Sequence, residues 1–289
     1  MAALVKIGIG VPTTIEGVSG DLLIEWARRA DASGFSSLSF IDRIAYSNYE
    51  VMTTLGAVAA VTKRVRLFPA VILGTTRSSG LLAKQATTVD RLSNGRLTLG
   101  LGIGARESDY EATELGYHDR GQRFDAQLAT LRRLWRGEPF SATVDPIGPP
   151  PVQEGGPELM IGAFTPTALK RVGLYGDGYI GVRTPADMEV CFRHVMDGWR
   201  EAGRAGAPRF VALNAFALGP DAEARGQVSV RAYYGYWKDR VDFIARSTLT
   251  TAAAIRDFVS ACASLGVDEV LLNPTIPELD QIDRLREIV

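Results

Sequence analysis

The chain has 289 residues, of which 46% are hydrophobic, and its 32 basic and 33 acidic residues leave a formal net charge of -1. A chain of this length can fold without disulfides or structural metals. Its near-neutral balance offers no field for nucleic acid, and no apolar run reaches the roughly 18–20 residues of a membrane span. Because the first residues also lack the basic region and cleavage site of a secretory signal, we expect a cytoplasmic protein without nucleic-acid or membrane partners.

Few side chains are available for a metal site. The chain contains two cysteines, Cys191 and Cys262, and two histidines, His118 and His194. Both cysteines and His194 fall in apolar helical patterns, which indicates packing residues. Neither a four-ligand zinc site nor a G-x-S-x-G or H-E-x-x-H motif is present. We therefore expect a small-molecule enzyme or binder without a bound metal.

Short apolar strands alternate with amphipathic helices along the first half of the chain. The hydrophobic pattern predicts strands at residues 6–12, 36–41, 65–73 and 96–103. It predicts helices at residues 21–33, 51–61 and 81–92. Asn94 and Gly95 follow the third helix and are typical of a helix end.

The alternation continues in the second half. Strands are predicted at residues 159–163, 178–182, 210–218 and 267–273. Helices are predicted at residues 124–135, 166–175, 185–202, 252–265 and 277–289. Residues 137–157 are rich in proline and indicate a surface excursion, because the alternation resumes beyond them.

Eight buried strands that alternate with helices predict a parallel sheet covered on both faces. We expect an α/β protein that forms a single (β/α)8 TIM barrel with rim insertions, with residues 1–289 in one domain. A doubly wound open sheet is the alternative. The absence of a linker between two independent patterns favours the single barrel.

In such a barrel, function lies at the carboxyl ends of the strands. The candidate residues at these ends are Val11, Pro12, Asp42, Arg43, Gly74, Thr75, Thr76, Gly102, Gly104, Ala105, Arg106, Glu107, Ala163, Phe164, Thr165, Arg183, Asn273 and Pro274. Asp42 and Arg43 form either a solvated pair or part of the pocket. His118, in a polar loop, is a further candidate.

Gly100, Gly102 and Gly104 end the fourth predicted strand. Glycines expose backbone N–H groups and allow a phosphate to approach closely. The spacing lacks the third glycine of the dinucleotide fingerprint and does not follow the first strand, which argues against a Rossmann fold. The glycines either ease strand packing or admit a phosphate or ring beside Arg106.

Two further segments have both a structural and a functional interpretation. Thr165 and Pro166 are typical of a helix start, and the same start can hold an anion with help from the Thr165 and Thr167 hydroxyls. Residues 229–248 are rich in tyrosine and other aromatic residues. They form either a helix that packs on the barrel or an aromatic lid over the substrate.

Residues 64–74 and 83–104 resemble the luciferase-like monooxygenase family. They read RVRLFPAVILG and AKQATTVDRLSNGRLTLGLGIG. The family combines such a third strand with a helix that ends in Leu-Ser-x-Gly-Arg and a fourth strand that ends in Gly-x-Gly. Residues 107–116, 165–166 and 266–270 are also similar, so the resemblance covers nearly the whole chain.

The resemblance implies a barrel that binds FMN or the deazaflavin coenzyme F420 at its carboxyl mouth. The cofactor-binding residues that it implies are Val11, Pro69, Ala70, Val71, Gly102, Gly104, Ala105, Arg106, Phe164 and Thr165. It also implies a non-proline cis peptide at Pro69–Ala70.

The residue after the acid of the second strand departs from the family pattern. Where the family often has histidine, this chain has Arg43, so no imidazole base is available at that position. We expect Arg43 to steady an anionic substrate or the reduced flavin. Asp42, Arg43 and His118 are the candidate catalytic residues, with His118 as the replacement base.

We expect a flavin-dependent oxidoreductase, specifically a monooxygenase that uses reduced FMN and dioxygen on a small organic substrate. A separate flavin reductase would supply the reduced FMN, and the resemblance implies a homodimer. Three alternatives remain: F420-dependent hydride transfer, a non-catalytic flavin-binding protein, and a non-flavin barrel enzyme that acts on a phosphate-bearing substrate.

Overall fold

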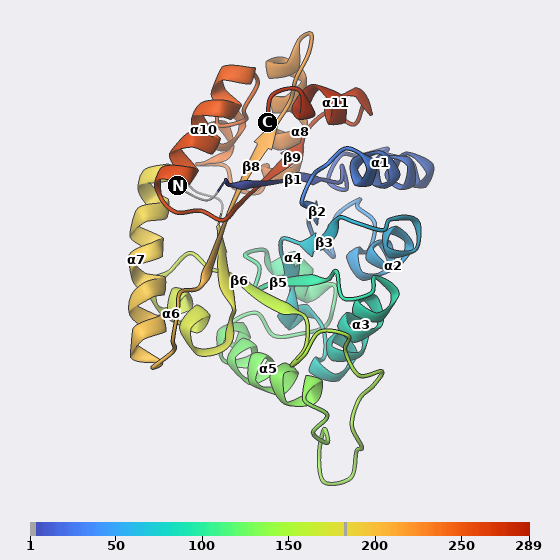
Figure 1. The fold of residues 1–289 in the computed structure, drawn as a ribbon, viewed down its shortest axis with the longest axis vertical. Helices are drawn as coiled ribbons and strands as arrows, with labels where there is room; N and C mark the ends of the chain where they lie inside the picture. The colour runs from blue at the N-terminus through green and yellow to red at the C-terminus, as the bar shows by residue number, and fades with distance from the viewer. Residues whose placement is uncertain (1–3, 182–183) are drawn as a thin grey trace.

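The strands form one parallel sheet that curls into a nearly closed barrel (Figure 1). This computed structural model describes residues 4–181 and 184–289. The strands are β1 (Lys6–Gly10), β2 (Ser37–Phe40), β3 (Arg66–Pro69), β4 (Ile72–Leu73), β5 (Thr98–Gly102), β6 (Glu158–Gly162), β7 (Gly178–Gly181), β8 (Arg209–Phe216) and β9 (Glu269–Pro274). Their order is β3-β2-β1-β9-β8-β7-β6-β5-β4. A parallel bridge between Leu67 and Leu97 brings β3 beside the chain that leads into β5.

The third predicted strand is divided, so the described residues form nine strands where the sequence predicts eight. The backbone N–H of Ala70 donates to the carbonyl of Phe40 at 2.7 Å, so the pairing with β2 extends one residue past Pro69. The chain leaves the ladder only after that bond. The non-proline cis peptide accordingly lies at Ala70–Val71, and the predicted position, Pro69–Ala70, was wrong by one residue.

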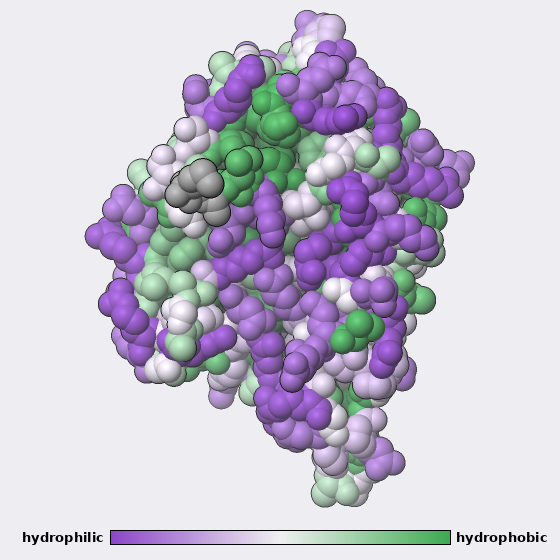
Figure 2. All heavy atoms as spheres, viewed as in Figure 1, coloured by the Kyte–Doolittle hydropathy of each residue, from purple (hydrophilic) through white to green (hydrophobic). Residues whose placement is uncertain are grey.

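Helices surround the strands (Figure 1). They are α1 (Gly20–Ala32), α2 (Val51–Val61), α3 (Ser79–Leu92), α4 (Glu107–Glu111), α5 (Arg120–Trp135), α6 (Pro166–Tyr175), α7 (Pro185–Glu201), α8 (Ala222–Tyr234), α9 (Val241–Arg246), α10 (Ala252–Ser264) and α11 (Asp280–Arg286), with a short 3-10 helix, η1 (Gly74–Thr76). Figure 2 shows hydrophilic side chains over most of the surface on this side, as expected for helices that bury one face against strands.

Most predicted elements are confirmed within a few residues. Residues 229–248 are a correction, because they hold the end of α8 and all of α9 instead of one helix. The last helix is shorter than predicted. Val182, the predicted end of the sixth strand, and Arg183 lie outside the described residues.

Local side-chain chemistry explains several helix boundaries. The side chains of Ser19, Ser78 and Thr165 each accept a hydrogen bond from a backbone N–H in the first turn of α1, α3 and α6. Asn94 and Gly95 end α3 with φ values of 55° and 79°, in the left-handed region that favours these residue types.

Alternation along the strands produces two hydrophobic layers. The outer layer lies between strands and helices and includes Leu38, Leu99 and Leu159. The inner layer fills the barrel with Phe68, Ala70, Met160, Ile180, Val211, Leu213 and Leu271. Within the described ranges, no helix has the length and apolar character that a membrane crossing requires.

Parallel strands place all their carboxyl ends at one end of the barrel. The helix α4 follows β5, and α8 and α9 are inserted between β8 and α10, so these three helices lie at the carboxyl end. The proline-rich excursion instead connects α5 to the amino end of β6 and extends away from the barrel (Figure 1). It therefore lies at the opposite end from the predicted site.

Candidate functional site

Glycines leave room for two side chains in the carboxyl mouth of the barrel. A Cβ on Gly102 would lie 2.8 Å from Cγ2 of Val71, and a Cβ on Gly162 would lie 3.0 Å from its Cγ1. A Cβ on Gly10 would lie 2.2 Å from Oδ1 of Asn273. Val71 and Asn273 can therefore occupy the mouth only because three strands carry glycine there.

Ser39 and Asn273 form a polar pair in this mouth. The Ser39 hydroxyl donates to Oδ1 of Asn273 at 2.5 Å, which leaves the amide nitrogen of Asn273 available. The position of Asn273 at a strand end made it a predicted candidate, whereas Ser39, inside a strand, was not predicted. The signal was present, because Ser37 and Ser39 are polar residues at alternate positions of a strand that is otherwise apolar.

Asp42 is fully engaged by its neighbours. Its carboxylate accepts hydrogen bonds from Leu73 N at 2.9 Å and from both terminal nitrogens of Arg77 at 2.6 and 3.1 Å. Arg77 also pairs with Glu50 at 2.9 Å. Burial opposes the charge on Arg77, but the two carboxylates outweigh it and raise the pKa of Arg77. Asp42 thus fixes the β3–β4 region, and its partner Arg77 was not among the predicted residues.

Arg43 forms a buried ion pair with Asp109 of α4. Nε of Arg43 lies 2.8 Å from Oδ2 of Asp109, and the two side chains are only 7% and 2% exposed. Oδ1 of Asp109 also accepts hydrogen bonds from the backbone N–H groups of Ile44 and Ala45 at 2.9 and 2.8 Å. One carboxylate therefore holds both the loop after β2 and the guanidinium of Arg43.

Arg106 is buried among tyrosines at the start of α4. Its guanidinium carbon lies 3.8 Å from the ring centroid of Tyr236 and 4.5 Å from that of Tyr233. Nη2 donates to the carbonyl oxygen of Tyr233 at 2.7 Å, and Nε is buried without a hydrogen-bond partner. Burial raises the pKa of Tyr233, while Arg106 opposes that rise. Among the ion pairs of the described residues, none involves Arg106, which is 9% exposed.

A pocket of about 450 Å³ joins these groups. Its lining combines two arginines with aromatic and small residues: Arg43, Tyr46, Ala105, Arg106, Glu107, Ser108, Tyr117, Ala232, Tyr233 and Tyr236. The pocket therefore brings together the predicted residues Arg43, Ala105, Arg106 and Glu107 with the end of α8. The tyrosines from α8 and the following turn form one wall, which fits the lid interpretation of residues 229–248.

Other predicted residues lie elsewhere. His118 is exposed beside the ring of Tyr117 and does not line the pocket. Val11 is 4% exposed and packs in the outer hydrophobic layer. Phe164 is exposed, and the Thr165 hydroxyl accepts a hydrogen bond from Ala168 N at 3.3 Å. No group of three metal-ligating side chains occurs in the part of the chain that the structure describes.

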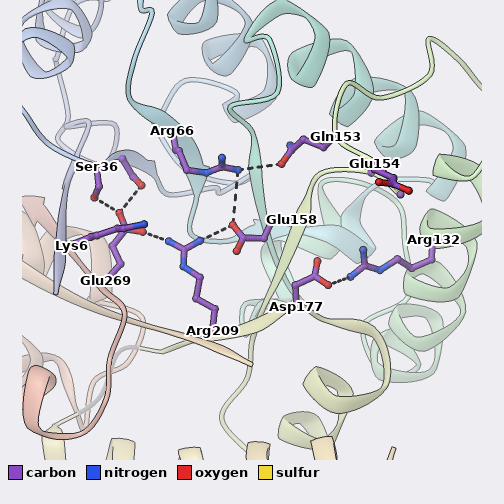
Figure 3. Close-up of a pocket in the computed structure, with 13 residues that line it drawn as sticks. Lys6, Ser36, Arg66, Arg132, Gln153, Glu154, Glu158, Asp177, Arg209 and Glu269 are labelled. Atoms are coloured by element: carbon purple, nitrogen blue, oxygen red, sulfur yellow. Dashed lines mark hydrogen bonds and ion pairs between the residues drawn. The ribbon is translucent and has the colours of Figure 1, made fainter. Parts of the chain in front are cut away.

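A larger pocket, of about 740 Å³, lies at the amino end of the barrel (Figure 3). Arg209 bridges Glu158 and Glu269 there, and Arg66 lies 4.0 Å from Glu158. Glu269 also accepts hydrogen bonds from Ser36 and Ser37. These charges neutralise one another, whereas barrel enzymes react at the carboxyl end, so the smaller pocket is the candidate functional site.

Comparison with known proteins identifies relatives along most of the chain. The family described as "Luciferase-like monooxygenase" matches residues 4–264. An uncharacterized protein of Mycobacterium tuberculosis is 32% identical over 179 residues, which are 60% of this chain and 63% of that protein. A phthiodiolone/phenolphthiodiolone dimycocerosates ketoreductase of the same species is 32% identical over 171 residues, 55% of this chain and 44% of the relative. The chain thus spans less than two thirds of these relatives' length.

Solved structures share the fold at low sequence identity. An F420-dependent secondary alcohol dehydrogenase in complex with an F420-acetone adduct has a TM-score of 0.84 at 18% identity over 98% of both chains. A monooxygenase from Streptomyces bottropensis has a TM-score of 0.79 at 21% identity, covering 98% of this chain and 97% of that one. The family match extends from β1 through α10, and the chain belongs to the luciferase-like monooxygenase family.

Proposed function

We propose that this protein is a flavin- or deazaflavin-dependent oxidoreductase with a cofactor phosphate on Arg106. The observation that carries the proposal is a buried guanidinium that has no carboxylate partner among the described residues and an unpartnered Nε. A buried charge without a counter-charge is unfavourable. A phosphate would supply that charge and match the fork of donors.

The mouth of the barrel also fits a planar ring. Val71 presents an apolar side chain between Gly102 and Gly162, where added methyl groups would collide with it. The Asn273 amide lies in the same mouth, on β9. When bound there, a flavin or deazaflavin supplies hydride transfer or, with dioxygen, oxygenation.

In this proposal the residues of the chain bind the cofactor, orient it and keep water out of the pocket. Arg106 holds the phosphate end, while Val71 and the glycines around it support the ring. Tyr233 and Tyr236, which line one side of the pocket, keep water away from a bound cofactor, and this strengthens the electrostatic contacts inside the pocket. Arg43 supplies a fixed hydrogen-bond donor to the pocket, and no imidazole is among the described residues that line it.

Two reactions are candidates for this site. The first is oxygenation of a small organic substrate with reduced FMN from a separate reductase. The second is hydride transfer from reduced F420 to a carbonyl, which is supported by the relative named as a ketoreductase. Anaerobic assays separate them, because only hydride transfer proceeds without dioxygen. A protein that binds a flavin but turns over with neither reductant would be a binding protein.

Arg106→Ala tests the placement of the phosphate. We expect this variant to bind FMN or F420 more than tenfold more weakly in isothermal titration calorimetry, because it loses a charge-assisted contact of about 1.5–3 kcal/mol. Its affinity for riboflavin, which has no phosphate, should be unchanged. The exposed Arg136 provides the control substitution, Arg136→Ala. An unchanged dissociation constant for the phosphorylated cofactor would contradict this placement, and failure of the wild type to bind either cofactor would refute the flavin proposal.

A further inference from the structure

The guanidinium of Arg43 is held from one side. Asp109 takes Nε at 2.8 Å, and Nη2 donates to the carbonyl oxygen of Ala45 at 3.1 Å. Nη1 makes no hydrogen bond to any residue that the structure describes. Because Arg43 lines the pocket, this nitrogen remains available to an acceptor inside it.

The anchor on Asp109 fixes the orientation of that donor. The carboxylate takes two backbone N–H groups in addition to Arg43, and its side chain is 2% exposed. It therefore resists rotation and holds the plane of the guanidinium. An arginine that is gripped through Nε keeps its outer edge for a planar anion such as a carboxylate.

The pocket contains a second guanidinium, that of Arg106, so that the cofactor and a second anionic group can each have an arginine of their own. Arg106 lies 4.5 Å and Arg43 lies 5.8 Å from the ring centroid of Tyr233, so both cations border the same aromatic side chain. Among the described residues that line the pocket, the exposed Glu107 is the only acidic one. If Arg106 holds the cofactor phosphate, Arg43 remains for another anionic group.

We propose that Arg43 is a specificity-determining residue that selects substrates with a carboxylate group, and that Asp109 is the residue that positions it. This inference rests on the proposed function, because it assigns the other arginine to the cofactor. The same chemistry would fit an anionic group of the cofactor itself. The experiment below separates the two sources.

The test measures charge selectivity with two probes of the same size, benzoate and benzamide. Wild-type protein is first saturated with oxidised FMN, or with F420 if only that cofactor binds, and each probe is titrated by calorimetry. We expect benzoate to bind at least about tenfold more tightly than benzamide. Arg43→Gln should reduce this ratio to about threefold or less and should change the cofactor dissociation constant by less than about threefold.

Two further variants guard against a folding artefact. Arg43→Lys keeps the charge beside Asp109 but offers one ammonium group, which cannot both pair with the carboxylate and reach the ligand, so the ratio should also fall. Asp109→Asn should lower the ratio, whereas general damage to the pocket would weaken both probes equally. Arg136→Gln is the matched surface control, and circular dichroism checks that each variant folds.

Two results would overturn the proposal. One is a wild-type protein that binds benzoate and benzamide equally. The other is an Arg43→Gln variant that keeps the ratio but weakens FMN as much as Arg106→Ala does, which would assign Arg43 to the cofactor. If neither cofactor binds the wild type, the proposed function fails, and the probe ratio in the cofactor-free protein still decides the role of Arg43.

Discussion

Gly102 on β5 leaves just enough space for the side chain of Val71 in the carboxyl mouth of the barrel. We expect Gly102→Ala to weaken cofactor binding by about tenfold, or about 1.4 kcal/mol, because the new Cβ would lie 2.8 Å from Cγ2 of Val71 and would displace that side chain. Calorimetry with FMN or F420 measures the effect. Gly56→Ala is the control, since a Cβ at this position in α2 meets nothing within 4 Å. Equal affinity in the Gly102 variant would show that the ring does not rest on Val71.

Asp31 provides a stability contribution that depends on pH. Its carboxylate accepts backbone N–H bonds from Lys63, Arg64 and Val65 at 2.8–2.9 Å. Burial alone would raise the pKa of Asp31, but these hydrogen bonds outweigh it and lower the pKa below 3.8. A lowered folded-state pKa stabilises the protein above the unfolded value, and this stabilisation is lost as the pH falls through the folded pKa.

Asp31→Asn should therefore lower the free energy of unfolding at pH 7 by about 1 kcal/mol, after allowance for solvent exposure. Urea denaturation at pH 7 and pH 3 measures the difference between wild type and variant. The gap should shrink at the lower pH, because the stabilisation by the charged carboxylate is lost as the pH falls through the lowered folded-state pKa. A gap that is the same at both values would assign the loss to packing.

At the level of elements, hydrophobic periodicity predicted the strands and most helices, because each of these buries one face or both, but it did not predict α4 or the separate helices α8 and α9. The division into β3 and β4 could not be predicted, since residues 65–73 are apolar apart from Arg66 and show no change of pattern at the break. That break depends on the contact of Ala70 with Phe40 and on the space that Gly102 and Gly162 leave for Val71. These are tertiary contacts between strands far apart in the sequence.

In the candidate site, the residues at strand ends could be predicted from the sequence, but the residues that position them could not. Arg43 and Arg106 follow from the rule that barrel function lies at strand ends. Asp109 does not, because its role requires a partner 66 residues away that only the closed barrel brings within reach. Arg77 was missed for the same reason, with Asp42 35 residues away. Side chains that position others thus need the fold before they can be recognised.

Contacts with Arg106 hold the end of α8 against the barrel. The guanidinium carbon lies 3.8 Å from the centroid of the Tyr236 ring, and Nη2 donates a hydrogen bond to the carbonyl oxygen of Tyr233. Tyr236→Leu removes a cation–π contact of about 1 kcal/mol, so we expect amide hydrogen exchange in residues 222–246 to become roughly fivefold faster in the cofactor-free protein. Phe243→Leu, at a side chain that is 59% exposed, is the control. Unchanged exchange in the Tyr236 variant would mean that α8 is held by its other contacts.

For the whole molecule, the charged network and the site of the proposed function lie at opposite ends of one barrel. The amino end holds the network of Arg66, Glu158, Arg209 and Glu269 (Figure 3). The carboxyl end holds two arginines that have donors left for a ligand. A hydrophobic layer of seven buried side chains lies between these ends. This arrangement predicts that substitutions in the network change stability without changing cofactor affinity.

Glu269→Gln tests that separation. Glu269 is 1% exposed and accepts bonds from Ser36, Ser37 and Arg209, so the variant weakens charge-assisted hydrogen bonds of about 1.5–3 kcal/mol. We expect the free energy of unfolding in urea to fall by about 2 kcal/mol, while the dissociation constant for FMN or F420 stays within about twofold of wild type. Arg106→Ala should show the reverse, because its pocket contributes more to binding than to folding. If Glu269→Gln weakened the cofactor as strongly as Arg106→Ala, the hydrophobic layer would have to transmit the disturbance from one end of the barrel to the other.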